Sequence, residues 1–562
     1  MLARHGADCT KRGLAAPLLF LALAFAAAGS QQALAAWWFG SLAALWFCTV
    51  LMNGPSRTPL TTLTVAITFF AAWSVATDLW VNPSYSVGAL YHAGLMLGGF
   101  MFGRAAGQPR LAFSFRVALV FALAVALWAL CRKVAETDPR AHSLFVTPAT
   151  LSSVLNLLLV PALILVACGE RRYAILGALF VLSAAFAAAQ SRGGWVALAT
   201  ALVFALFLLR RAKVKLERRA TVVAAMAFLA GALVAWLLII GGPEQTRFVA
   251  DAASLQERLD LYALAFKGLE DSSWFFGAGY HAFFYLLRAA GSMPLYAGRS
   301  TYFVHNDYLQ TLFELGLPAL VALLLLVILP LRAAWRSAPR MTNREDAVAL
   351  VALAAAICSM ATHALADFPF YIPVCALVYG AALGFIDAIG LASGHEYAWT
   401  IPWPPRLRRV VLAGLATIAA WILAVPVAAE AAGEYGLHQW RAARNQSAAY
   451  WLEIARRLDR RDWRYHWYAG EFWFAQAAET GNRQAAALAD TSFASAYAAN
   501  PREARSLYNR IQLHSRLRNL LATPANAETM RVWANRAAEL APADPNVRAE
   551  RERVFKQFGA PK

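Results

Sequence analysis

Charged residues are scarce in this chain, and their scarcity excludes an ordinary soluble protein. Only 15% of the 562 residues are charged, while 60% are hydrophobic and the mean hydropathy is +0.48. A soluble domain carries about 25% charged residues. Long uncharged apolar runs follow one another from Ala15 to Val427. Runs of this length predict an all-α, polytopic membrane protein.

Cysteines are also few, and none lies where a disulfide framework would need it. The long polar loop and the C-terminal tail contain none, so these parts cannot hold disulfides or a CxxC metal site. In or beside apolar runs, cysteines are expected to be small buried residues. All six lie there or in the N-terminal tail: Cys9, Cys48, Cys131, Cys168, Cys358 and Cys375.

The signatures of nucleotide-driven and metal-dependent chemistry are missing as well. The chain has no GxxxxGK[ST] phosphate loop, no HExxH pair and no GxSxG turn. Its long loop contains no close pair of carboxylates that would bind a metal. These absences argue against an ATP-driven pump, and no metal or cofactor is predicted. Any group transferred outside the cytoplasm must therefore bring its own activation.

The apolar runs predict about thirteen membrane spans. The first run follows basic residues, but another run comes directly after it. We therefore interpret it as an uncleaved span rather than a signal peptide. The expected spans lie near 15–32, 33–52, 60–78, 86–103, 111–131, 149–168, 173–190, 194–209, 220–241, 308–331, 346–365, 370–390 and 410–427.

Lys and Arg alternate between the loops that join these spans. Because basic loops stay in the cytoplasm, the pattern places the N-terminus inside, and both the loop 242–306 and the tail after Val427 outside. The net charge of +18 therefore reflects topology, and no nucleic acid partner is predicted. The basic set is Arg57; Arg104 and Arg110; Arg171 and Arg172; Arg210, Arg211, Lys213, Lys215, Arg218 and Arg219; Arg332, Arg336, Arg340 and Arg344; and Arg406, Arg408 and Arg409.

The long loop contains a predicted helix of its own. Ser254 and Glu257 have the spacing of a capping box, and the helix should end near Asp271, before a turn from Gly277 to His281. Arg258 lies on its polar side, either as a solvated charge or as a functional cation. The expected apolar stripe is Leu255, Leu259, Tyr262, Phe266 and Leu269.

Arg192 stands in the short segment Ser191-Arg192-Gly193-Gly194, on the side that should be poor in Arg. The glycines allow a tight turn and a close approach of the backbone. Such an Arg can clamp a phosphate through its forked donors, or it can extend toward lipid headgroups. Both interpretations are open from the residues alone.

His305 precedes a long apolar helix. Asp307 and Gln310 have the spacing of a capping box, so this helix should begin just after His305. A titratable ring is therefore expected at the boundary between water and lipid. Farther along, His363 and Asp367 share one helical face at the outer end of another span. That pair can orient a substrate or hold the end of the helix.

The tail, 428–562, is more highly charged, and its apolar residues become periodic. Three segments, at 455–463, 496–504 and 537–545, recur at about 41 to 42 residues and resemble degenerate tetratricopeptide helix pairs, whose usual period is about 34. Such pairs form scaffolds that often bind a partner, although a plain helical bundle also fits. Trp and Tyr are dense between Tyr450 and Phe474, which suits core packing, a membrane surface or sugar rings.

With these residues in view, the chain resembles the O-antigen ligase and O-antigen polymerase superfamily. The matching segments are SRGGW at 191–195, QERLDLYALAFKGLEDSSWFFGAGYHAF at 256–283 and HNDYLQTLFELGLPALVALL at 305–324. They follow the family order, and a many-span core with one long periplasmic loop before the His-containing helix also fits. The resemblance covers roughly 170–390 well. Each segment alone is a weak signal, but the combination is fairly specific.

The resemblance implies a glycosyltransferase of the bacterial inner membrane that uses a polyprenyl-diphosphate-linked glycan as donor. Transfer would take place on the periplasmic face, with inversion and without a cofactor, nucleotide or metal. Arg192 and Arg258 are then expected to clamp the diphosphate, and His305 to activate the acceptor. Nearby Arg and the helix N-terminus should keep His305 neutral. We also predict Asn306, His281 and His363 as substrate-binding residues.

The tail departs from the simple ligases of this superfamily, which usually end after the last span. It divides the chain into a predicted membrane domain, 1–427, and a predicted periplasmic tetratricopeptide-like domain, 428–562. It also leaves the acceptor open between lipid A core, another lipid-linked glycan and a protein. Membrane lipid is an expected partner, and the tail offers a surface for a protein. A protein O-oligosaccharyltransferase and a flippase of lipid-linked glycans are the alternative functions.

Overall fold

The structure, a computed structural model, describes residues 57–81, 86–135, 141, 147–169, 173–240, 252–291, 303–394, 399–402 and 404–559. The expected spans 15–32 and 33–52 lie outside the described residues. Every other expected span coincides with a helix. Eight of the described helices are long and apolar enough to cross a membrane. The prediction of an all-α membrane bundle is confirmed.

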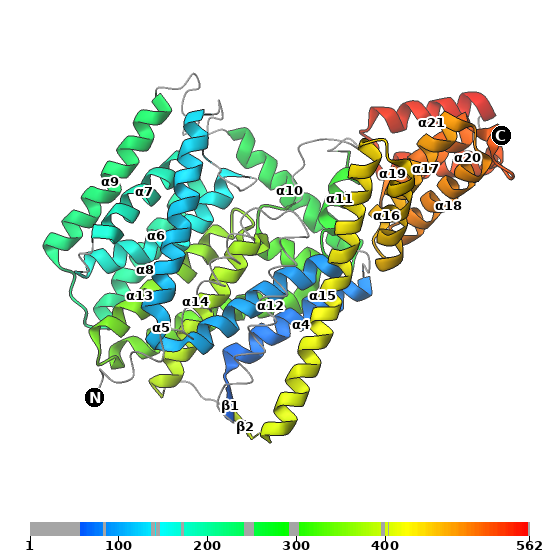
Figure 1. The fold of residues 1–562 in the computed structure, drawn as a ribbon. Helices are drawn as coiled ribbons and strands as arrows, with labels where there is room; N and C mark the ends of the chain where they lie inside the picture. Colours follow the sequence, from blue (N-terminus) through cyan, green and yellow to red (C-terminus); the bar gives the residue numbers. More distant parts are fainter. Residues whose placement is uncertain are drawn as a thin grey trace.

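The membrane part is a bundle of long apolar helices (Figure 1). Helix α5 accounts for two expected spans, because Gly107 adopts φ 58° and ψ −175° and bends the helix between them. The helices are α4 (Thr62–Val81), α5 (Ser86–Ala135), α6 (Pro148–Ala167), α7 (Tyr173–Ala188), α8 (Arg192–Arg211), α9 (Arg218–Ile240), α12 (Asp307–Ser337), η2 (Ala338–Arg340), α13 (Arg344–His363), η3 (Pro369–Tyr371), α14 (Pro373–Ala392) and α15 (Pro405–Arg441).

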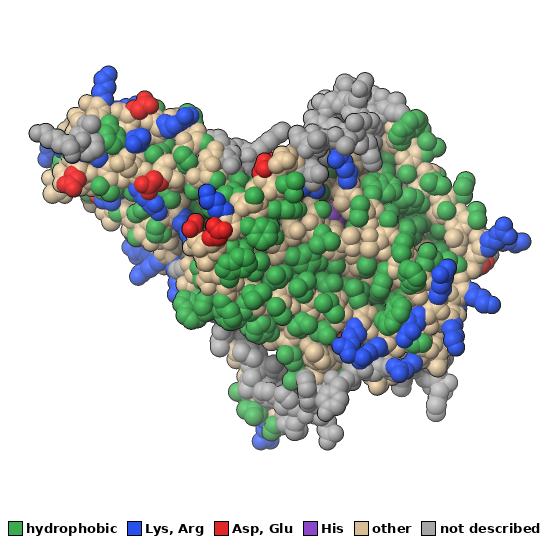
Figure 2. All heavy atoms as spheres, turned by 180° about the vertical axis from the view of Figure 1, so that it is seen from behind, with side chains coloured by type: hydrophobic (Ala, Val, Ile, Leu, Met, Phe, Trp, Pro, Cys, Tyr) green, Lys and Arg blue, Asp and Glu red, His purple; other side chains and the backbone are tan. Residues whose placement is uncertain are grey.

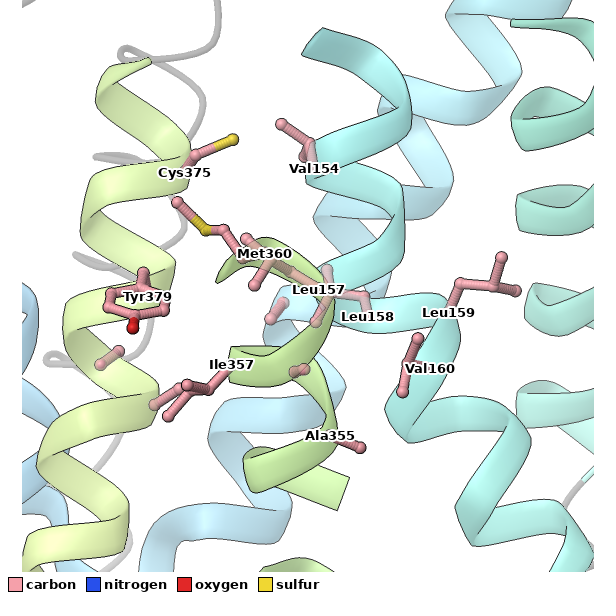
Figure 3. Close-up of a cluster of buried hydrophobic side chains, with 14 of the residues drawn as sticks. Val154, Leu157, Leu158, Leu159, Val160, Ala355, Ile357, Met360, Cys375 and Tyr379 are labelled. Carbon is pink, nitrogen blue, oxygen red and sulfur yellow. The ribbon is translucent and has the colours of Figure 1, made fainter. Parts of the chain in front are cut away.

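The core lies where α6, α13 and α14 meet α5. Figure 3 shows part of it, with Leu157 of α6 beside Ile357 and Met360 of α13 and with Tyr379 of α14 on the other side. The Tyr379 hydroxyl donates to the carbonyl oxygen of Leu326 at 3.1 Å, which satisfies the polar group of that buried ring. These helices are apolar around most of their circumference, as expected for helices surrounded by other helices.

Two pairs of glycines allow α5 and α14 to pack with their backbones in contact. Gly99 and Gly103 of α5 face the carbonyl groups of Leu377 and Ala381, and Gly380 and Gly384 of α14 face those of Met96 and Phe100. A Cβ at any of these glycines would collide with the opposite backbone. Small residues four apart are a common basis for helix association in membranes. This contact was not predicted from the sequence.

Elements that the charge pattern placed on one side of the membrane meet at one end of the bundle. A short antiparallel ribbon joins β1 (Arg57–Leu60) to β2 (Trp399–Pro402). At the same predicted side, Arg211 donates to the carbonyl oxygen of Trp335 at 2.8 Å, and Arg344 donates to that of Cys168 at 2.7 Å. In Figure 2, basic side chains gather below a broad apolar band.

The long loop and the tail lie together at the other end of the bundle (Figure 1). The loop forms α10 (Ala252–Glu270) and α11 (Ala282–Ala289). The tail is joined to α11 through an ion pair between Arg288 and Glu503, whose side chains are 2% and 0% exposed. Asn500 also donates to the hydroxyl of Tyr285 at 3.0 Å. This contact agrees with the prediction that loop and tail share one side.

The tail is a succession of short helices, each packed on the next. Helix α15 passes the predicted boundary at 427/428 without a break and packs on α16. The tetratricopeptide assignment and the domain division remain predictions. The dense aromatic segment mainly forms core, since Trp463 and Tyr465 are buried. The helices are α16 (Asn445–Leu458), α17 (Trp463–Thr480), α18 (Arg483–Ala499), α19 (Ala504–Arg516), η4 (Arg518–Leu520), α20 (Ala527–Leu540) and α21 (Pro545–Phe558).

Candidate functional site

His305 lies in a backbone conformation that few side chains adopt. Its φ is 60°, in the left-handed region, and α12 begins two residues later. The predicted capping box is wrong in one respect: the cap is Asn306, whose Oδ1 accepts from the amides of Tyr308 and Leu309 at 3.1 and 3.0 Å. Asp307 instead turns away, and its Oδ2 accepts from the amide of Phe370 at 2.7 Å. A strained position held so firmly is typical of a functional site.

Hydrogen bonds on both sides of His305 fix the chain there. Before it, the amide of Val304 donates to Oε1 of Gln310 at 2.6 Å. After it, the amide of Asp307 donates to the carbonyl oxygen of Ala364 at 2.9 Å. The start of α12 is thereby attached to the segment that follows α13. The predicted substrate-binding role of Asn306 is left to its side-chain nitrogen, because its oxygen caps the helix.

Asp367 lies between His305 and His363. Its Oδ1 is 3.3 Å from Nδ1 of His305, and its Oδ2 is 3.8 Å from Nε2 of His363. The side chain of His305 is 18% exposed, whereas His363 is buried and its Nδ1 is 2.9 Å from Oγ of Ser153. The sequence analysis paired Asp367 only with His363. The contact with His305 joins residues 62 apart in the chain, which no local pattern reveals.

Arg192 and Gly193 reach this cluster from α8. Ser191 caps the helix by accepting from the amide of Gly194 at 3.1 Å, which makes Arg192 its first residue, with an exposed side chain. A Cβ on Gly193 would lie 3.1 Å from Cδ2 of His363. The expected close approach at the glycines is confirmed, and it brings Arg192 next to the segment that carries Asp367.

Arg258 reaches the cluster from α10, and its side chain is half-buried. Its charge acts on Tyr262, one turn farther along, and on His363. Burial raises the pKa of Tyr262, while Arg258 and a hydrogen bond with Asn306 oppose the rise. The Tyr262 hydroxyl donates to the carbonyl oxygen of His305 at 3.1 Å. His305 therefore contacts Asp367, and Gly193, the residue after Arg192, approaches His363, on which the charge of Arg258 also acts.

The predicted apolar stripe of α10 is partly wrong. The buried residues are Leu261, Ala265 and Leu269, which pack toward α11 and α12, whereas Leu259 and Phe266 are about half exposed. Apolar residues cover a wide arc of this helix, so the neighbouring helices decide which of them are buried. The side chain of Leu255 lies outside the part of the chain that the structure describes.

His281 lies at the start of α11. It adopts φ 60° there, and its ring packs edge-on against Tyr280 at 4.5 Å between centroids. Burial lowers the pKa of His281 to about 4, so its ring is neutral near pH 7. A chain of ring contacts connects His281 to His305. Between ring centroids, Phe303 lies 6.0 Å from His281 and 4.1 Å from Phe368, and Phe368 lies 5.1 Å from His305.

Helix α12 is broken at Gly316, a feature that the sequence analysis missed. Gly316 adopts φ 80° and ψ 178°, and the loop before α11 fills the break. The amides of Ala278 and Gly279 donate to the carbonyl oxygens of Phe313 and Glu314 at 2.8 and 2.9 Å. The sequence Glu-Leu-Gly-Leu-Pro was a usable signal, since Gly followed by Pro commonly interrupts a helix. The break separates the part of α12 that begins beside His305 from the part that crosses the membrane.

A comparison with protein families identifies this arrangement. The family model described as O-antigen ligase matches residues 177–324. This part of the chain is similar to O-antigen ligases. The match contains Arg192, Arg258, His305 and the first part of α12 with its break, but not Asp367. No curated protein matches the chain.

The similarity to O-antigen ligases supports a membrane transferase that joins a lipid-linked glycan to an acceptor. The residues around Asp367 suit this chemistry, because a His held by a carboxylate can accept a proton and two Arg can stabilise a leaving diphosphate. Among the described residues, no group of three or more His, Cys, Asp or Glu could hold a metal ion.

Proposed function

We propose that this protein transfers an oligosaccharide from a polyprenyl-diphosphate donor to an acceptor hydroxyl on the periplasmic face of the bacterial inner membrane. The observation that carries the proposal is the contact between His305 and Asp367, at the end of the bundle where the long loop lies. The similarity to O-antigen ligases supports the reaction class. The charge pattern of the loops supports the periplasmic side.

Asp367 orients the ring of His305 for proton transfer. With Nδ1 3.3 Å from the carboxylate, the hydrogen of the neutral ring belongs on Nδ1 and points toward Oδ1. Nε2 then carries the lone pair and acts as the base. It takes the proton of the acceptor hydroxyl while the acceptor oxygen attacks the anomeric carbon. The carboxylate stabilises the positive ring that results.

Arg192 and Arg258 act on the leaving group. As the new glycosidic bond forms, the bond from the anomeric carbon to the diphosphate oxygen breaks, and its electron pair stays on polyprenyl diphosphate. Two guanidinium groups can neutralise the charge that builds there. Because the donor already contains a high-energy diphosphate, the reaction needs no nucleotide or metal, and direct displacement inverts the anomeric carbon.

The test measures release of polyprenyl diphosphate by the purified full-length protein in lipid nanodiscs. The reaction contains polyprenyl-diphosphate glycan, one candidate acceptor and a chelator, without ATP. We expect His305→Ala, Arg192→Ala and Arg258→Ala each to reduce the rate by at least about 100-fold. His438→Ala and Arg336→Ala are matched controls, since both residues are exposed and distant in sequence from the cluster.

Two results would contradict the proposal. If His305→Ala and Arg192→Ala release polyprenyl diphosphate as fast as the unmodified protein, the assignment of the site is wrong. If the protein moves lipid-linked glycan across vesicle membranes with no covalent product, it is a flippase. Running the assay with lipid A core, with a second lipid-linked glycan and with a Ser- and Thr-rich protein separates ligase, polymerase and protein transferase.

A further inference from the structure

A groove of about 340 Å³ lies where three parts of the chain meet. The end of α4 contributes Trp80, the segment between α10 and α11 contributes residues from Asp271 to Ala278, and the tail contributes Arg502. Pockets at such junctions commonly bind small molecules. The groove does not include the residues around Asp367, so it is distinct from the proposed catalytic site.

The aromatic wall of the groove is unusually exposed. Trp80 is 75% exposed and touches Phe276 at a tilted angle, with 5.0 Å between ring centroids. Phe276 in turn stacks on Trp73, whose Nε1 donates to the carbonyl oxygen of Leu315 at 2.9 Å beside the break in α12. The Trp80 ring is thus supported from one side, while its remaining surface borders the groove.

The groove is also lined by groups that can bind hydroxyls. Asp271 is exposed and accepts hydrogen bonds, while Arg502 donates to the carbonyl oxygen of Ala278 at 2.9 Å and borders the same space. The Oγ of Ser272 is buried, and no described residue satisfies it. One carboxylate and one guanidinium beside an indole present an acceptor and donors next to an apolar face.

We infer that this groove is a saccharide subsite, which holds one sugar of the membrane-anchored glycan that the protein acts on. A sugar ring has an apolar face of C–H groups, whose slight positive charge suits the negative face of an indole. Its hydroxyls project from the rim, where Asp271 accepts and Arg502 donates. This inference rests on the proposed function, and it names the part of the substrate that the tail helps to bind.

The position of the groove suits a glycan attached to a lipid. Trp80 lies at the end of a spanning helix, where aromatic residues mark the membrane surface. The first part of α12, Asp307 to Leu315, connects the break beside the groove to the residues after His305. At 1.5 Å per residue this separation is roughly 13 Å. A glycan of a few sugars can therefore reach both places at once.

The experiment measures binding of free glycan to the full-length protein in lipid nanodiscs by isothermal titration calorimetry. The probe is the oligosaccharide released by mild acid from the polyprenyl-diphosphate lipids of the host cells. We expect Trp80→Ala to raise Kd about ten-fold, the loss expected for one aromatic face. Asp271→Asn should also weaken binding. Trp128→Ala, which removes another exposed Trp near the end of a span, should leave Kd unchanged.

The inference is overturned if unmodified protein does not bind the free glycan, or if Trp80→Ala and Asp271→Asn both bind it as the unmodified protein does. Competition by glycerophosphoglycerol would also overturn it, because the groove would then be a lipid headgroup site. The proposed function fails separately. His305→Ala should keep the Kd for the glycan but lose release of polyprenyl diphosphate. If glycan binding depends on Trp80 but the unmodified protein releases no polyprenyl diphosphate, the subsite stands and the proposed function is wrong.

Discussion

The ion pair between Arg288 and Glu503 provides a quantitative test of how the tail is attached to the long loop. Arg288 donates through one guanidinium nitrogen to Oε1 of Glu503 at 2.7 Å. Replacing Glu503 by Gln and Arg288 by Met removes one charge at a time. Gln keeps a side-chain oxygen at the position from which Glu503 caps α19.

The two substitutions should destabilise the contact to different extents. Among the described ion pairs, Glu503 has two Arg partners, whereas Arg288 is paired with Glu503 alone. Arg505 lies 3.0 Å from the same carboxylate, so Arg288→Met leaves Glu503 with a counter-charge. Glu503→Gln leaves the buried guanidinium of Arg288 against the ring of Phe284, 4.4 Å away. Stranding a buried charge costs about 3–5 kcal/mol. Losing one of two charged hydrogen bonds costs about 1.5–3 kcal/mol.

Hydrogen exchange of the amides in α11 and α19 measures this cost on the intact protein. Glu503→Gln should speed exchange in both helices more than Arg288→Met does. Arg536→Met breaks an exposed pair with Glu539, and it should change the free energy of opening measured by exchange by less than about 1 kcal/mol. The reasoning is refuted if Arg288→Met has an equal or larger effect than Glu503→Gln.

Three further changes test other parts of the structure. Asp367→Asn should lower kcat at least about 100-fold with little change in KM, because the ring of His305 loses its orienting charge; an unchanged initial rate of polyprenyl diphosphate release would contradict this. Gly380→Ala should destabilise the bundle by about 1–3 kcal/mol in thermal unfolding, whereas Gly94→Ala, which has open space around it, should not. Burial alone would raise the pKa of Asp490, but hydrogen bonds from His514 and Arg510 lower it to about 2. Because the pKa of Asp490 is lowered in the folded state, its ionised carboxylate contributes about 2 kcal/mol to stability above its ordinary pKa. This contribution is lost as pH falls toward 2. Hydrogen exchange of α18, compared with and without Asp490→Asn, should show that loss.

The sequence predicted the helices well because the membrane imposes a strong and local requirement. A span needs a continuous apolar run, so its position is visible without any knowledge of its neighbours. The bend at Gly107 and the glycines that join α5 to α14 were harder, since a glycine shows its purpose only when the opposite backbone is known. Such contacts join residues far apart in the chain.

In the candidate site too, local features could be predicted from the sequence, whereas contacts between distant residues could not. Arg192, Arg258 and His305 were selected from their surroundings in the sequence and from a family resemblance. The structure places His305 beside Asp367, and it places the residue after Arg192 beside His363, on which the charge of Arg258 acts. Asp367 was predicted only as a partner of His363, because helical spacing reveals neighbours one turn away and nothing beyond. Tyr262, which fixes the carbonyl of His305, was expected in an apolar stripe.

The continuity of helix α15 limits where residues can be inserted into this chain. It runs from Pro405 to Arg441 without a break, and the tail that follows it is attached to α11. Inserting one residue into a helix turns everything after it by about 100° and moves it by about 1.5 Å. The tail would then face away from α11. Single insertions between the last span and the tail should therefore be harmful, whereas an insertion of seven residues, close to two full turns, restores the direction and fails only by the added length.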